Sequence, residues 1–251
     1  MDLGLNGKRV LITGGTRGIG RALLETFVAE QADVSFCARN ADSVAQVVSD
    51  YSDVNCRVIG EPVDVSDIGA LQAWIDRSAE ALGGIDVFIS NVSAMGGPDK
   101  WQQVFELDVL GTVRGVEAVL PHMRASGAGS IVIVNSTAAV ETFRGPTAYA
   151  AFKAGLLNYA KNLSRELAPE SIRVNSVVPG PVFVEGGAWD QVRAQKPEEF
   201  DKVLSDLPMG RMAAPEDVAR SVVFLASEAA SYVSGTSLVV VPRHVVNARD
   251  R

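Results

Sequence analysis

A phenol and an amine stand four residues apart in the run YAAFK, which begins at Tyr149 and ends at Lys153. On a helix this spacing puts both side chains on one face. A free tyrosine titrates near pH ~10, too high for proton exchange at neutral pH. A nearby ammonium favours the phenolate, so the pair predicts general acid–base chemistry. The same spacing also occurs on many surface helices, where it has no catalytic meaning.

A hydroxyl precedes this pair at the end of an apolar run. Residues 130–136 read SIVIVNS, an apolar strand that closes with Asn135 and Ser136. In open α/β sheets, ligands bind at the carboxyl ends of the parallel strands. We therefore expect Ser136 to lie at a ligand site together with Tyr149 and Lys153.

A glycine-rich turn stands between the first apolar run and the first amphipathic segment. Glycine lets the backbone turn sharply and approach a phosphate closely, and the following helix N-terminus favours negative charge. A tight structural turn is the alternative, but the position between a strand and a helix favours a dinucleotide site. The residues that we expect to contact the cofactor here are Gly14, Thr16, Arg17, Gly18, Ile19 and Gly20.

Apolar runs alternate with segments of helical periodicity along the whole chain. This alternation predicts a doubly wound, mostly parallel α/β sheet of the Rossmann type, with seven strands and helices on both faces. We expect one domain over residues 1–251, with a substrate lid at about 180–208, where glycines and prolines interrupt the pattern. The expected strands are 9–13, 34–38, 57–63, 85–91, 130–136, 173–178 and 238–241, and the expected helices are 19–30, 41–51, 68–82, 101–124, 148–167 and 215–225.

Composition excludes several other classes of protein. The 251 residues carry a net charge of −7, which argues against a nucleic-acid partner. Two histidines and two cysteines without metal-ligand spacing predict no metal. No basic leader and no apolar run of membrane-spanning length is present, so we expect no membrane partner and a cytoplasmic location.

The glycine spacing Gly14-x-x-x-Gly18-x-Gly20, together with Ser136, Tyr149 and Lys153 in this order, resembles the short-chain dehydrogenase/reductase family. The resemblance extends from about residue 7 to residue 240. It implies that the serine binds a substrate oxygen and that the tyrosine exchanges its proton. The lysine would hold the nicotinamide ribose and acidify the tyrosine. It also implies a homodimer or homotetramer.

The end of the second strand indicates the cofactor. In dinucleotide-binding folds an acid there pairs with the ribose 2′-hydroxyl of NAD, whereas this chain has Ala38 followed by Arg39. Arg39 and Arg17 suit a 2′-phosphate, so we favour NADP(H) over NAD(H), the alternative being that both arginines are merely solvated. The resemblance further implies that the cofactor contacts Asp64, Val65, Asn91, Tyr149, Lys153, Pro179, Gly180 and Val182.

The sequence departs from the family pattern in four places. The fourth-strand motif reads SNVS over residues 90–93, so Asn91 alone remains of the usual asparagine pair. Asp108 stands where the family has an asparagine that holds a proton-relay water. Val184 replaces a threonine near the nicotinamide, and residues 241–243 replace the usual Asp-Gly-Gly. For Asp108 we weigh two hypotheses equally: a catalytic role in the proton relay, and a purely structural one.

Two functions remain open at this point. The first is an NADP(H)-dependent oxidoreductase that interconverts a small-molecule carbonyl and a secondary alcohol, with Tyr149 as general acid/base. The second is a catalytically weak NADP(H)-binding sensor or scaffold on the same fold. Retention of Ser136, Tyr149 and Lys153 together favours the enzyme. Substrate contacts are equally open. Phe183, Trp189, Val192 and Met209 of the lid, with Met95 and Phe143 from other loops, could line an apolar pocket, and the alternative is that several of them pack into a small core of the lid's own.

Overall fold

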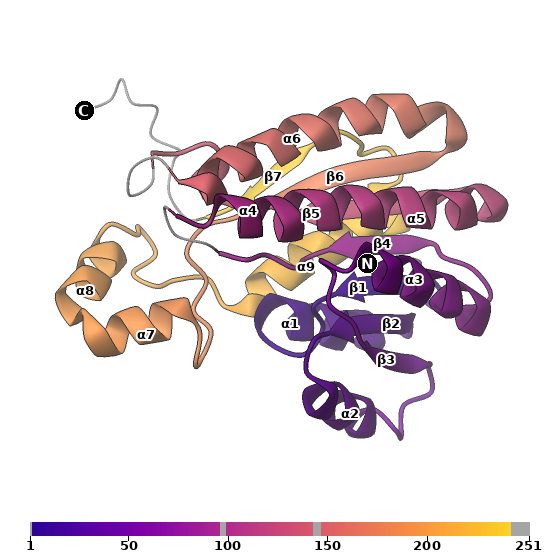
Figure 1. Ribbon diagram of the computed structural model, residues 1–251, viewed down its shortest axis with the longest axis horizontal. Helices are drawn as coiled ribbons and strands as arrows, with labels where there is room; N and C mark the ends of the chain where they lie inside the picture. Colours follow the sequence, from indigo (N-terminus) through magenta and orange to yellow (C-terminus); the bar gives the residue numbers. More distant parts are fainter. Residues whose placement is uncertain (1, 96–98, 143–146, 242–251) are drawn as a thin grey trace.

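Seven parallel strands form one sheet in the computed structural model, which describes residues 2–95, 99–142 and 147–241 (Figure 1). The strand order is β3-β2-β1-β4-β5-β6-β7, and every pairing is parallel. The predicted fold class is confirmed, and each predicted strand is present: β1 has the predicted ends, and the ends of the other six differ by at most two residues. The strands are β1 (Arg9–Thr13), β2 (Asp33–Ala38), β3 (Val58–Pro62), β4 (Val87–Ser90), β5 (Gly129–Val134), β6 (Ile172–Pro179) and β7 (Ser237–Val240).

The central strands are apolar on successive residues because both faces of the sheet are covered. In β1, Val10 and Ile12 pack into one core and Leu11 into the other. All six residues of β5 are buried. Parallel sheets with helices on both faces show this continuous burial, in contrast to the alternation of half-exposed sheets.

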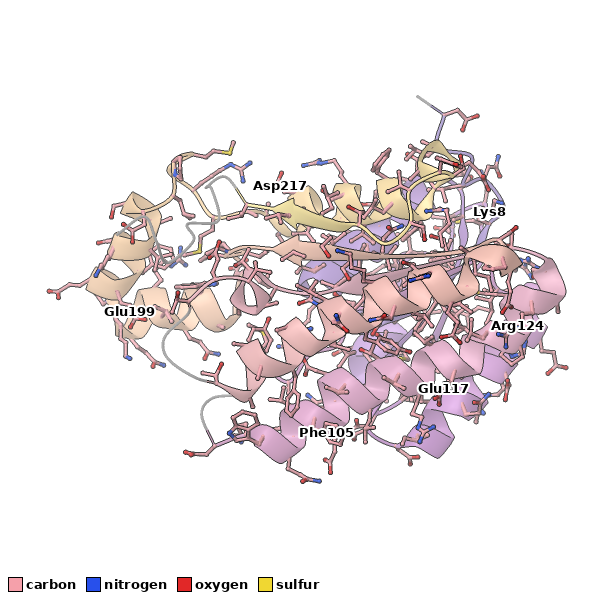
Figure 2. All side chains as sticks on the ribbon, turned by 90° about the horizontal axis from the view of Figure 1, so that it is seen from above. Lys8, Phe105, Glu117, Arg124, Glu199 and Asp217 are labelled. Carbon is pink, nitrogen blue, oxygen red and sulfur yellow. The ribbon has the colours of Figure 1, made fainter. Side chains whose placement is uncertain are left out.

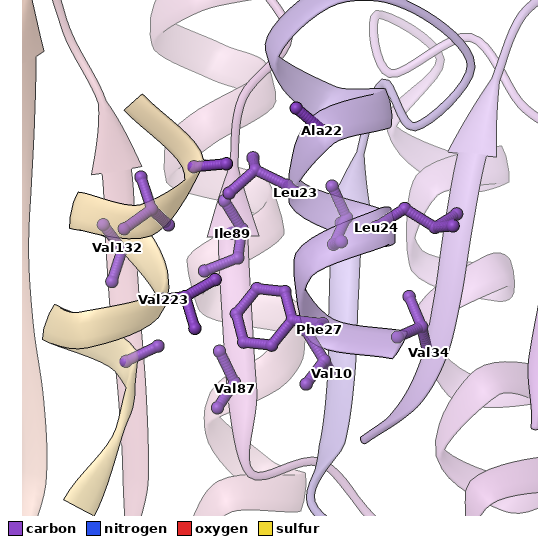
Figure 3. Packing of buried hydrophobic residues seen from close by; sticks show 14 of the residues in the cluster. Val10, Ala22, Leu23, Leu24, Phe27, Val34, Val87, Ile89, Val132 and Val223 are labelled. Atoms are coloured by element: carbon purple, nitrogen blue, oxygen red, sulfur yellow. The ribbon is translucent and has the colours of Figure 1, made fainter. Parts of the chain in front are cut away.

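Two helical layers make these cores. The first contains α1 (Gly18–Ala29), α2 (Ala41–Asp50) and α9 (Pro215–Ala226); the second contains α3 (Ile68–Leu82), α5 (Gly111–Ser126) and α6 (Ala148–Leu167). Figure 3 shows the first core, where Phe27 of α1 and Val223 of α9 lie over Val87 and Ile89 of β4.

The helix predicted over residues 101–124 is not continuous. It consists of α4 (Trp101–Val104), the π-helical segment η1 (Phe105–Leu110) and α5. Figure 2 shows Phe105 near one end of this run and Arg124 near the other, alongside α6. A π-helical turn contains one more residue than an α-helical turn, and such turns often occur at functional sites. Apolar periodicity does not reveal one widened turn inside an otherwise regular helix.

The order of the strands locates the site. The chain runs outward from β1 through β2 to β3, and then returns to place β4 on the other side of β1. The direction of winding therefore reverses between β1 and β4. Ligands of doubly wound sheets bind in the crevice outside the carboxyl ends of the strands at such a switch point.

The segment predicted as a lid contains two short helices, α7 (Ala188–Gln195) and α8 (Pro197–Ser205). They pack against each other and project to the left of the sheet in Figure 1. Within the described residues, no helix is long and apolar enough to cross a membrane.

Candidate active site

The glycine-rich turn after β1 can be made only by glycine at its critical positions. Gly14 has a φ of 79° and Gly18 a φ of 54°, a region that other residues rarely adopt. A Cβ atom on Gly20 would lie 1.7 Å from the carbonyl oxygen of Gly14. This contact explains why the first turn of α1 needs glycine where it passes the preceding loop.

Asn91 stabilises this turn through hydrogen bonds. Its side-chain amide donates to the carbonyl oxygens of Thr13, at 3.0 Å, and Gly14, at 3.2 Å. Its backbone N–H donates to the Thr13 hydroxyl at 2.9 Å. Asn91 follows β4 and Thr13 ends β1, so these bonds join the two strands at the switch point. The structure therefore shows Asn91 as a support of the turn.

The N-terminus of α1 has the features of an anion site. Arg17 precedes the helix in an extended conformation, and its side chain makes no capping hydrogen bond. The first amides of a helix lack intrahelical acceptors, and a phosphate can accept from them. A hollow of about 320 Å³ lies beside it, lined by Arg17, Gly18 and Arg21 and also by the acids Glu25, Glu185 and Glu216.

The residue directly after β2 is the cation Arg39, where NAD-binding folds commonly have an acid. Arg39 is exposed and makes no hydrogen bond or ion pair with any described residue, whereas Asn40 caps α2 by accepting from the Ser43 amide at 2.7 Å. Asp64 follows the neighbouring strand β3. Hydrogen bonds from the amide and hydroxyl of Ser66 lower its pKa, and the positive charge of Arg39 lowers it further. Asp64 is therefore held as a carboxylate beside the arginine.

Ser136 and Tyr149 come from different elements that meet at the carboxyl end of β5. The Ser136 hydroxyl oxygen accepts from the Ala138 amide at 3.2 Å, so its own proton stays available for a ligand. Tyr149 lies in the first turn of α6 and is half-buried. Thr147 caps this turn by accepting from the Ala150 amide at 3.2 Å, which fixes where the helix begins.

Lys153 lies one helical turn after Tyr149 and is only 2% exposed. Its ammonium donates to the carbonyl oxygen of Val134, the last residue of β5, at 3.1 Å. The same nitrogen lies 5.8 Å from the centroid of the Tyr149 ring. The structure therefore brings the amine and the phenol together where the strand ends.

Asn135, which is absent from the predicted site, bonds to the backbone of both Ser136 and Lys153. Its amide donates to the Lys153 carbonyl at 3.1 Å, and its side-chain oxygen accepts from the Ser136 amide at 2.8 Å. One buried side chain thus ties the strand end to α6. The signal in the sequence is its place directly before Ser136, because amides at strand ends commonly bond to the neighbouring backbone.

Asp108 is buried on η1 and contacts Lys153. Its Oδ2 atom lies 3.3 Å from the Lys153 ammonium and accepts from the Ser93 hydroxyl at 2.6 Å. Its Oδ1 atom accepts from the Ala94 amide at 2.8 Å. Ser93 is a second residue that is absent from the predicted site, because its pairing with Asp108 depends on the return of the chain from β4 to η1.

The chain after β6 passes close to the glycine-rich turn. The Gly180 amide donates to the Val240 carbonyl at 3.0 Å, and Val182 forms a bridge with Ala213. A Cβ atom on Gly18 would lie 3.4 Å from the Val184 side chain. Pro179, Gly180 and Val182 are thus held against β7 and the start of α9, next to the expected phosphate site.

The apolar residues considered as substrate contacts are placed differently in the structure. Phe183, Trp189 and Val192 pack with Phe200 and its neighbours in a small core of the lid's own. Met95 and Met209 are exposed, at 63% and 64%. Phe143 lies outside the described residues. For the first three residues the structure favours packing within the lid.

A larger hollow, about 600 Å³, opens at the opposite edge of the sheet. It borders the amino ends of β4, β5 and β6, and Lys8, Asp86 and Tyr232 are among its lining residues. None of the predicted site residues lines it, so size alone does not mark the site here. In the described residues, no cluster of three or more His, Cys, Asp or Glu side chains could hold a metal.

Comparisons with known proteins cover nearly the whole chain. A family model described as enoyl-(acyl carrier protein) reductase matches residues 14–241. The chain is 40% identical to isoepoxydon dehydrogenase of Penicillium expansum over 96% of this chain and 95% of that protein. It is 33% identical to 3-oxoacyl-[acyl-carrier-protein] reductase of Chlamydia pneumoniae, over 96% and 98%.

A solved structure agrees with these matches. L-sorbose reductase from Gluconobacter frateurii, complexed with NADPH and L-sorbose, superposes with a TM-score of 0.88 and 30% identity, over 98% of this chain and 100% of that one. The resemblance inferred from the motifs is thereby confirmed. The chain belongs to the short-chain dehydrogenase/reductase family, whose members are oxidoreductases that act on CH–OH groups with nicotinamide cofactors.

Proposed function

We propose that the protein is an NADP(H)-dependent oxidoreductase that interconverts a carbonyl and a secondary alcohol, with Tyr149 as the general acid/base. One observation carries the proposal. The buried Lys153 ammonium lies 5.8 Å from the centroid of the Tyr149 ring. Both groups lie near the end of β5, whose last residue, Val134, stands two residues before Ser136. A protein that only binds a nucleotide needs no acid–base pair beside a strand-end hydroxyl.

Each side chain has a distinct task. In reduction, Tyr149 gives its proton to the substrate oxygen, and in oxidation it takes the proton back. Ser136 donates its free hydroxyl proton to the same oxygen and so orients it. Lys153 stabilises the phenolate by its positive charge. When bound, the nicotinamide supplies or accepts the hydride.

The residues present fit such a cofactor. The N-terminus of α1 has no side-chain cap, so its first amides are free to bind a pyrophosphate, and the glycines of the preceding turn leave room for its approach. Arg39 and Arg17 are exposed cations beside it, and no acid follows β2, which favours NADP(H) over NAD(H). The residues proposed to hold it are Gly14, Thr16, Arg17, Gly18, Ile19, Gly20, Arg39, Asp64, Val65, Asn91, Tyr149, Lys153, Pro179, Gly180 and Val182.

Asp108 contacts the amine and not the expected position of the substrate. Its 3.3 Å contact with Lys153 supports a role that acts through that side chain. We therefore count Asp108 with the proposed acid–base machinery, although the substrate oxygen would meet Ser136 and Tyr149.

Three substrates should be assayed first, because they appear in the names of related proteins. They are isoepoxydon, a 3-oxoacyl thioester and L-sorbose. The lid proposed at about 180–208 would cover the bound substrate. The core formed by Phe183, Phe200 and their neighbours joins α7 and α8, so the two helices would move as one body.

Replacing Tyr149 with phenylalanine tests the proposal. We expect kcat to fall by about a hundredfold or more, the usual contribution of a general acid/base, with NADPH binding retained. Tyr159→Phe is the matched control, because Tyr159 lies on the same helix and burial raises its pKa to about 12. Tight NADPH binding without any Tyr149-dependent turnover would favour the sensor or scaffold instead.

Three further expectations remain proposals. The chain is proposed to form one domain over residues 1–251 and to assemble as a homodimer or homotetramer, which light scattering of the purified protein would measure. A cytoplasmic location is also proposed. The free thiols of Cys37 and Cys56 suit a reducing compartment.

A further inference from the structure

Two positions where the sequence departs from the family pattern touch each other and the proposed acid–base pair. Asp108 is 1% exposed and Lys153 is 2% exposed, so their opposite charges are both buried. Ser93, on the loop after β4, donates its hydroxyl proton to Asp108 at 2.6 Å. A buried charge is costly unless it is paired and hydrogen-bonded, and this carboxylate is both.

The contacts around Asp108 require a carboxylate. Its Oδ1 atom faces the Ala94 amide at 2.8 Å, and its Oδ2 atom faces the Lys153 ammonium at 3.3 Å. Neither partner can accept a hydrogen bond. An asparagine would therefore set its NH₂ group against one of these donors in either orientation. The isosteric amide cannot replace the acid without a shift of the amine or of the loop.

Ser93 extends the contact into the loop. Its hydroxyl oxygen also accepts from the Met95 amide at 3.2 Å. Met95 has a φ of 45°, a conformation that residues other than glycine rarely adopt, so this bond helps to hold a strained turn. Ser93 and Asp108 thus connect the loop at the switch point with the amine on α6.

We propose that Ser93, Asp108 and Lys153 act as one unit, in which Ser93 and Asp108 are positioning residues for the ammonium. The carboxylate and the Val134 carbonyl hold the nitrogen from two sides, at 3.3 and 3.1 Å, and so set its distance from Tyr149. The inference rests on the proposed function, because it concerns the amine of the proposed acid–base pair.

A double-mutant cycle tests the unit. Asp108→Asn should lower kcat at least about tenfold, since a displacement of ~1 Å can cost a hundredfold, while KM changes less than about threefold. Ser93→Ala should lower kcat about threefold in the wild-type background and have almost no effect beside Asp108→Asn. The reason is that Ser93 acts on the amine only through the carboxylate.

Ser90→Ala provides the matched control. Ser90 ends β4 three residues earlier, and its hydroxyl bonds to that of Thr112 at 2.9 Å, also buried. Its loss should lower the melting temperature and leave kcat within about twofold. Melting temperatures of the ligand-free variants form a second cycle, in which the losses from Ser93→Ala and Asp108→Asn should again fail to add.

Each outcome decides the matter. Equal factors for Ser93→Ala in both backgrounds would overturn the unit, and so would a kcat of folded Asp108→Asn that falls by less than about tenfold. If Asp108→Asn does not fold, a loss of kcat in Ser93→Ala but not in Ser90→Ala supports the unit, and equal effects overturn it. If the wild type shows no Tyr149-dependent turnover, the proposed function fails, and additive melting losses would then overturn the unit separately.

Discussion

Lys153 shows how much of a residue's role depends on contacts that spacing does not encode. Its distance of four residues from Tyr149 predicts a shared helix face, and the structure places both groups together. Its hydrogen bond to Val134 and its contact with Asp108 come from elements 19 and 45 residues earlier. Asn135 and Ser93 were missed for the same reason, since single polar residues acquire a role only through such distant partners.

Arg39 is the residue on which the cofactor preference should depend. Arg39→Ala should weaken NADPH binding by about tenfold to a hundredfold, the loss expected from one charge-assisted hydrogen bond worth ~1.5–3 kcal/mol. NADH binding should change little, because NADH lacks the 2′-phosphate. Fluorescence titration of both nucleotides measures the ratio. Arg114→Ala, on the exposed surface of α5, is the control, and a parallel loss for both nucleotides would contradict the assignment.

At the scale of elements, prediction succeeds where the pattern is local and regular. The helices Ile68–Leu82 and Ala148–Leu167 have the predicted ends, since a capping Asp67 and a capping Thr147 stand directly before them. The continuous helix over 101–124 was wrong in its middle. Asp108 in this π-helical turn contacts Ser93, Ala94 and Lys153 of other elements, and hydrophobic periodicity carries no information about such contacts.

The start of α9 should give the molecule an acid-sensitive point. Hydrogen bonds from Arg211 and from the Ala214 amide lower the pKa of Asp217 to about 2, from 3.8 in the absence of partners. A depressed pKa means that the ionised carboxylate stabilises the fold. This contribution is complete above about pH 4 and is lost as the pH falls toward 2.

Thermal unfolding of Asp217→Asn across pH measures this effect. The variant should melt below the wild type at pH 6, and the difference should shrink between pH 4 and pH 2 as the wild-type carboxylate takes up its proton. Asp53→Asn, a change at an exposed acid, is the control. A difference that stays constant across this range would exclude Asp217 as its source.

At the scale of the whole molecule, seven alternating strand and helix patterns were enough to predict the doubly wound class. The order of the strands also places the glycine-rich turn and Asn91 at one switch point. The sequence was less informative about the lid. The pairing of Phe183 with Phe200, whose ring centroids are 6.2 Å apart, joins two parts of that segment into a core of its own.

Cofactor binding should stabilise the entire fold. A nucleotide at a hundred times its Kd adds about 2.7 kcal/mol to the free energy of unfolding, which raises the melting temperature of a chain of this size by about 5–10 °C. We expect this rise with NADPH and a smaller one with NADH at equal concentration. Tyr149→Phe should show nearly the same rise, because it removes a single hydroxyl among the many proposed cofactor contacts while it removes the proposed acid–base group. No shift with either nucleotide would contradict the proposed site.

Cys37 ends up next to the glycine-rich turn, because its carbonyl accepts from the amides of Gly14 and Gly15 at 2.8 and 3.1 Å. Its own sulfur is fully enclosed, and burial raises its pKa to about 12. Oxidants and alkylating reagents attack the thiolate, which is scarce at neutral pH under these conditions. The nucleotide half of the sheet thus carries a sulfur atom that peroxide or an electrophile reaches only when that half opens.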